Sequence, residues 1–187
     1  DRDSGQMIAE VGLSLLWIAS ALAILQFGIG WVAVARKRDD QISGLRAIAV
    51  GQGILVTLSF LALIILFLRS DMSVMLVAAN SHSAKPWLYK LAGTWGNHEG
   101  SMLLWVTILG VSGSAVAVFE RSLKASTLMA TLSAQAALSI GFYAFLLFSS
   151  NPFTRLLPAS ADGQGLNPLL QDPGLAFHPP TLYLGYV

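Results

Sequence analysis

A histidine and a glutamate stand side by side at the start of a long apolar run, in residues 94–106, TWGNHEGSMLLWV. Such a pair suggests a zinc protease, whose motif needs a second histidine four positions after the first. Position 102 is a methionine, so the pair does not belong to such a zinc site. Two interpretations remain open. In one, Glu99 favours the positive end of a helix and Trp95 lies at the lipid headgroups; in the other, the stretch shapes a surface for a planar, partly apolar ligand that bears carboxylates or a metal.

The second candidate is His178, in the stretch GLAFHPPTLYLGYV of residues 174–187. Pro179 restricts the residue before it to extended backbone angles, and a proline suits the first turn of a helix. We therefore expect a helix to begin at the two prolines, with His178 held rigidly at its entrance. The helix dipole disfavours imidazolium there, and neutral imidazole is the form that ligates iron. Such a histidine suits an axial haem ligand, the alternative being a histidine that only caps the interface.

The composition of the chain indicates a membrane protein. Of its 187 residues 55% are hydrophobic and only 11% are charged, whereas soluble domains carry about 25% charged residues. The net charge of +1 argues against nucleic acid as a partner, because no cluster of basic residues supplies a phosphate-binding field. The chain has no cysteine, which excludes disulfides, thiolate metal ligands and thiol catalysis within it.

Uncharged runs predict where the chain crosses the membrane, since a helix needs about 20 apolar residues to cross the hydrocarbon core. Four runs are long enough, and a fifth begins near the end of the chain: residues 11–35, 47–68, 101–119, 125–150 and 181–187. The expected fold is an all-α integral membrane protein with four complete transmembrane helices plus the start of a fifth. Residues 1–6 are expected to be a tail or a cloning remnant, and residues 7–187 the N-terminal part of a polytopic helical domain.

Basic residues predict the orientation. The two short connections, residues 36–46 and 120–124, hold six of the eleven lysines and arginines, which places them in the cytoplasm by the positive-inside rule. The N-terminus and two long, turn-rich segments, 69–98 and 151–180, then lie in the periplasm of a bacterium, with all three histidines. A short helix is expected over residues 86–92, since proline suits a helix start. Segment 151–180, with six of the seven prolines, is expected to form a stiff cap that packs against the helix ends.

Three blocks carry a family resemblance: WGNHEGSMLLWV, NPFTRLLPA and DGQGLNPLLQDPGLAFHPPTLYLGYV. They resemble the N-terminal region of the cytochrome c maturation protein F family over about residues 7–187. That family is the multispanning membrane subunit of the bacterial haem lyase and includes relatives dedicated to nitrite reductase. The resemblance implies a subunit that holds haem at the periplasmic face of the inner membrane for covalent attachment to apocytochrome c. It implies haem as cofactor, with a haem chaperone, other haem lyase subunits and apocytochrome c as partners.

The resemblance also suggests site residues. The histidine of the family's HPP motif matches His178, which becomes an axial ligand of the haem iron and one of a pair of external histidines. The residues expected to shape the site are Trp95, Gly96, His98, Glu99, Gly100, Ser101, Asn167, Asp172, Pro173, Pro179 and Pro180. No catalytic residue is assigned, because the implied mechanism is positioning. The family's second external histidine, its tryptophan-rich signature and its intramembrane histidines have no counterpart here, so this chain is not expected to act alone.

Two other functions remain open. One is a haem exporter of the related tryptophan-rich family, and the other is a polytopic solute transporter. The four complete spans contain no acidic or basic residue, whereas coupled transporters usually keep some. A solute path would therefore have to use polar residues such as Gln26 or Gln135.

Overall fold

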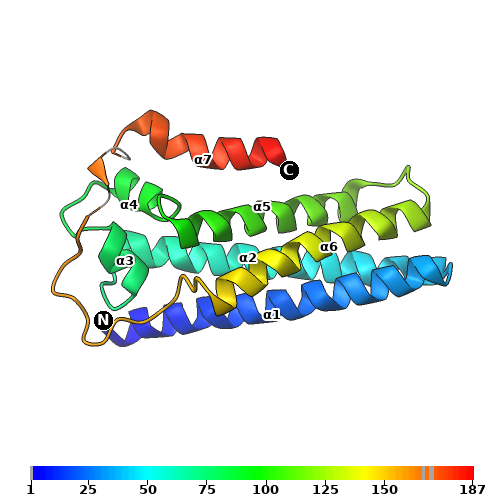
Figure 1. Cartoon of the computed structure of the whole chain (residues 1–187), viewed down its shortest axis with the longest axis horizontal. Helices are drawn as coiled ribbons and strands as arrows, with labels where there is room; N and C mark the ends of the chain where they lie inside the picture. Colours follow the sequence, from blue (N-terminus) through cyan, green and yellow to red (C-terminus); the bar gives the residue numbers. More distant parts are fainter. Residues whose placement is uncertain (1, 166, 169–170) are drawn as a thin grey trace.

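Four long helices lie side by side in a bundle in the computed structural model, which describes residues 2–165, 167–168 and 171–187 (Figure 1). They are α1 (Arg2–Ala35), α2 (Ile42–Leu68), α5 (His98–Phe119) and α6 (Ala125–Phe148). All four are long and apolar enough to cross a membrane. The expectation of an all-helical membrane protein with four spans is therefore confirmed.

The bundle is held together by apolar packing and by a few buried polar contacts. Leu63, Phe67 and Tyr143 belong to its larger core, and all three are fully buried. Between α1 and α6, Gln26 Nε2 donates hydrogen bonds to Gln135 Oε1 and to the Leu132 carbonyl, both at 2.8 Å. Hydrogen bonds of this kind stabilise helix pairs in lipid. The two glutamines that a solute path would have needed are thus contacts between helices.

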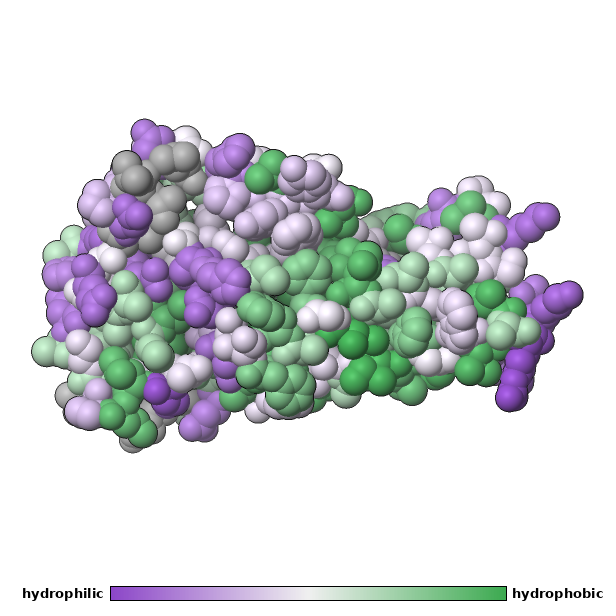
Figure 2. All heavy atoms as spheres, viewed as in Figure 1, coloured by the Kyte–Doolittle hydropathy of each residue, from purple (hydrophilic) through white to green (hydrophobic). Residues whose placement is uncertain are grey.

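Shorter elements cover one end of the bundle, which we call the α3–α4 end. They are α3 (Met75–Asn80) and α4 (Trp87–Gly93), whereas the opposite end carries η1 (Asp39–Gln41) and the 120–124 connection (Figure 1). Pro86 directly precedes α4, so the helix expected over residues 86–92 is present and shifted by one position. Figure 2 shows hydrophilic residues gathered at both ends and hydrophobic residues along the middle, as expected for helices that cross a bilayer.

The segment that follows α6 packs against the bundle. Its backbone pairs with the residues around α3: Met75 N donates to the Thr154 carbonyl at 2.9 Å, and Leu156 N donates to the Ser73 carbonyl at 2.8 Å. The ring of Phe153, only 2% exposed, lies against Gly12 of α1. These contacts hold the segment against α1 and the start of α3.

The last helix begins earlier than the sequence suggested. The predicted start at the two prolines is wrong, because α7 (Pro173–Tyr186) contains Pro179 and Pro180 in its interior and His178 is helical. The start is set by Asp172, whose Oδ1 accepts a hydrogen bond from Gly174 N at 2.8 Å. A capping aspartate followed by a proline at the first helical position is a strong start signal. A fifth membrane span over residues 181–187 stays a prediction.

Candidate functional site

His178 lies on an exposed face of α7. The helix is attached to α5 and to the turn before it: Trp95 Nε1 donates a hydrogen bond to the Ala176 carbonyl at 2.8 Å, and the rings of Trp105 and Tyr183 stack with centroids 5.2 Å apart and planes 9° apart. Ala176 and Tyr183 are two turns apart and share one face of the helix. His178 follows Ala176 by two positions, which rotates it by about 200° around the helix axis. Its side chain therefore projects from the side of α7 opposite to α5.

The stretch WGNHEGS forms a tight turn that starts α5. Asn97 caps the helix, since its Oδ1 accepts a hydrogen bond from Gly100 N at 2.7 Å while its Nδ2 donates to the Gly93 carbonyl, also at 2.7 Å. Ser101 Oγ donates to the Trp95 carbonyl at 2.6 Å. The turn leaves no room for a side chain at Gly100, where a Cβ would lie 1.6 Å from the Thr94 carbonyl oxygen.

Asn97 was not among the residues singled out from the sequence, although a signal was present. Asparagine is one of the preferred residues directly before a helix, and here it stands one position before the His-Glu pair. The side chain that holds the turn together is that of Asn97, which lies between Gly96 and the His-Glu pair.

His98 and Glu99 occupy the first turn of α5. The exposed ring of His98 packs edge-on against Phe145 of α6, with centroids 5.2 Å apart and planes at 82°. His98 thus contacts α6, whereas Trp95 of the same motif contacts α7. Within the described part of the chain, no three His, Asp or Glu side chains form a group that could hold a metal ion.

The other predicted site residues lie around the start of α7 and in the turn. Asp172 caps α7 and Pro173 is its first residue. Asn167 is exposed in the segment before α7. Gly96 N donates to the Ala92 carbonyl at 2.9 Å, which links the turn to the end of α4. Two of these residues, Asp172 and Pro173, therefore determine where α7 begins.

A second polar cluster at the α3–α4 end was not expected from the sequence. The carboxylate of Asp162 accepts hydrogen bonds from Ser83 Oγ at 2.6 Å, Ser83 N at 3.0 Å and Gly163 N at 2.7 Å, and His82 Nε2 lies 3.3 Å away. The hydrogen bonds from Ser83 are the main reason that the pKa of Asp162 is lowered to about 2. The cluster connects the α3–α4 loop to the segment after α6. Residues so distant in the sequence give no local signal of such a contact.

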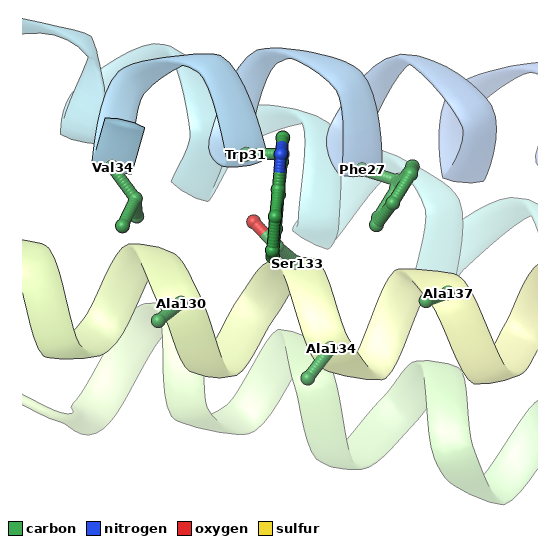
Figure 3. Close-up of a pocket in the computed structure, with 7 residues that line it drawn as sticks. All are labelled: Phe27, Trp31, Val34, Ala130, Ser133, Ala134 and Ala137. Atoms are coloured by element: carbon green, nitrogen blue, oxygen red, sulfur yellow. The ribbon is translucent and has the colours of Figure 1, made fainter. Parts of the chain in front are cut away.

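A groove of about 200 Å³ lies on the flank of the bundle between α1 and α6 (Figure 3). Its walls include Phe27, Trp31 and Ala134, and the side-chain hydroxyl of Ser133 donates to the Met129 carbonyl at 2.7 Å. Among the residues that the structure describes, no titratable side chain lines the groove. An apolar surface of this kind is better suited to contact with a lipid chain or another helix than to catalysis.

Comparisons with known proteins agree on one family. Residues 95–187 match the family model described as cytochrome C assembly protein. The chain is 50% identical to the cytochrome c-type biogenesis protein CycK of Bradyrhizobium diazoefficiens and 47% identical to CcmF of Pseudomonas aeruginosa, in both cases over 97% of its length. It is 40% identical to NrfE of Haemophilus influenzae. These alignments cover 27% of CycK and 28% of CcmF and NrfE, so the chain spans little more than a quarter of its relatives.

The fold is also that of a solved structure. The structure titled cytochrome c heme lyase CcmF superposes with a TM-score of 0.82 over 96% of this chain and 28% of that one. The sequence identity in this comparison is 23%, so the comparison supports the arrangement of the helices alone.

Proposed function

The chain belongs to the cytochrome c assembly protein family, and we propose that it is part of the membrane subunit of a haem lyase. In this proposal the subunit holds haem for covalent attachment to apocytochrome c during cytochrome c maturation. The observation that carries the proposal is the identity of 40–51% over almost the whole chain to relatives named for cytochrome c biogenesis.

His178 is the residue proposed to ligate the haem iron. Three features support this role: the exposed position of the side chain, its location on the face of α7 away from α5, and the two attachments that hold that helix. An imidazole held in this way supplies one axial ligand. A second axial histidine would come from another part of the full-length protein, because the chain covers little more than a quarter of its relatives.

The residues of this chain would contribute position more than acid–base chemistry. Haem is the substrate, and its vinyl groups would be joined to the cysteine thiols of apocytochrome c. Holding the two reactants in a fixed geometry accounts for much of the rate of such a reaction. The turn at Trp95 and the cap at Asp172 would serve this purpose, because they set the position of α7.

The α3–α4 end is proposed to face the periplasm from the bacterial inner membrane. Support comes from the basic residues, six of which lie in the two connections at the opposite end. A haem chaperone, other haem lyase subunits and apocytochrome c would then meet the protein at the α3–α4 end.

The test uses His178→Ala in the full-length protein. We expect covalently attached haem in cytochrome c to fall to background, because the iron loses an axial ligand. His82→Ala is the matched control, since this histidine lies at the same end, pairs with Asp162 and is not among the predicted site residues. Normal cytochrome c levels with His178→Ala, at normal amounts of the membrane protein, would falsify the assignment.

A further inference from the structure

The carbonyl group of Ala176 has lost its ordinary partner. In an α-helix, the carbonyl of one residue accepts a hydrogen bond from the N–H four positions later. The residue four positions after Ala176 is Pro180, which has no N–H. Ala176 is only 3% exposed, so water cannot easily replace the missing donor. A buried carbonyl without a donor is costly, and this turn of α7 needs one from outside the helix.

The indole of Trp95 provides that donor. Its Nε1–H reaches the Ala176 carbonyl at 2.8 Å, a normal hydrogen-bond distance. Trp95 is itself fixed, because its own carbonyl accepts the hydrogen bond from Ser101 Oγ and its N–H donates to the Ala92 carbonyl at 3.3 Å. The turn at the start of α5 therefore presents the indole N–H at a defined place.

We propose that Trp95 is a positioning residue for His178, because its indole N–H replaces the backbone donor that Pro180 lacks. The bond keeps this turn of α7 paired, and it thereby sets the direction in which His178, two residues further on, projects. The stacking of Trp105 on Tyr183 holds the same face of the helix independently of this bond. The inference rests on the proposed role of His178 as a haem ligand.

The effect of the hydrogen bond can be distinguished experimentally from the effect of packing of the Trp95 ring. Trp95→Phe keeps an aromatic ring and removes the N–H. Pro180→Ala returns a backbone N–H to the helix, so that the Ala176 carbonyl can pair within α7. The two changes together form a double-mutant cycle, in which the second should make the first harmless.

The experiment measures haem binding by the full-length protein in detergent, from the absorption bands of histidine-ligated haem. We expect Trp95→Phe to weaken binding about fivefold in the natural background, the worth of one hydrogen bond. In the Pro180→Ala background, the same change should have less than about a twofold effect. Trp87→Phe is the control, because Trp87 is 68% exposed on α4 and should not matter in either background.

Other outcomes would overturn the inference. An equal loss in both backgrounds would show that the effect of Trp95→Phe does not depend on the donor that Pro180 lacks, and no loss in either background would exclude a role of the indole N–H. If Trp95→Phe lowers the amount of protein, Pro180→Ala should restore that amount, and a failure to restore it counts against the proposal.

A readout without haem keeps this inference distinct from the proposed function. His178→Cys can be labelled with a maleimide, and its labelling rate should change with Trp95→Phe and recover with Pro180→Ala. If His178→Ala leaves the haem spectrum unchanged, the proposed ligand role fails. The labelling experiment would then still decide whether Trp95 positions α7, and an unchanged rate would reject that claim.

Discussion

At the scale of single residues, Gly100 is required by the close approach of the chain to itself before α5. A Cβ there would lie 1.6 Å from the Thr94 carbonyl oxygen, so Gly100→Ala must displace the turn that holds Trp95. We expect the change to destabilise the protein by about 1–3 kcal/mol, the usual cost of overpacking. The measurement is thermal unfolding of the full-length protein in detergent. Gly141→Ala in α6 is the control, because a Cβ there meets no described atom within 4 Å; equal melting temperatures of the two variants would contradict the prediction.

Asn97 makes a second prediction at this scale. Its side chain caps α5 and also reaches back to the Gly93 carbonyl at the end of α4. Asn97→Ala should lower the free energy of unfolding by about 1 kcal/mol, the typical value of a helix cap. Asn97→Asp keeps the oxygen that accepts from Gly100 N and should recover most of the loss. If the two substitutions melt alike, the cap does not contribute.

At the scale of elements, the cluster at Asp162 attaches the segment after α6 to the α3–α4 loop. The pKa of Asp162 is lowered to about 2 from an ordinary value of 3.8, mainly by the hydrogen bonds from Ser83. A carboxylate with a lowered pKa stabilises the folded arrangement above its unfolded pKa, and the contribution is lost as the pH falls towards the folded value. We therefore expect the segment to loosen between about pH 4 and pH 2, measured as hydrogen exchange of its backbone amides. Asp162→Asn should loosen the segment at neutral pH as well, and tight protection in that variant would count against the cluster.

The four membrane spans could be predicted from the sequence, whereas the start of α7 could not, and the difference has a physical reason. The spans are predictable because a long run without charge is a local property of the chain. The start of α7 is not predictable in this way, because two signals compete. The prolines at 179 and 180 suggest one helix start, and Asp172 with Pro173 suggests an earlier one. The structure favours the earlier one, and the lost backbone donor at Pro180 is replaced by Trp95, which is distant in the sequence. The pairing of His82 with Asp162 escaped prediction for the same reason.

At the scale of the whole molecule, the two ends of the bundle differ in what they carry. The α3–α4 end bears the histidines and the turn-rich segments. The opposite end bears the basic connections, where the guanidinium of Arg46 donates to the Ala117 carbonyl and, at 2.8 Å, to the Glu120 carbonyl at the end of α5. A cation at a helix C-terminus is favourable, so Arg46 both joins α2 to α5 and adds to the positive charge of this end.

This asymmetry predicts which end faces which compartment. Because the chain has no cysteine of its own, single cysteines can report on each end in a cysteine-free full-length protein. We expect Ala84→Cys, exposed in the α3–α4 loop, to react with a membrane-impermeant maleimide in cells whose outer membrane has been opened. Leu123→Cys, 44% exposed in the connection between α5 and α6, should react only after the inner membrane is permeabilised. The reverse pattern would place His178 in the cytoplasm, where haem could not meet a periplasmic apocytochrome, and the proposed function would fail with the topology.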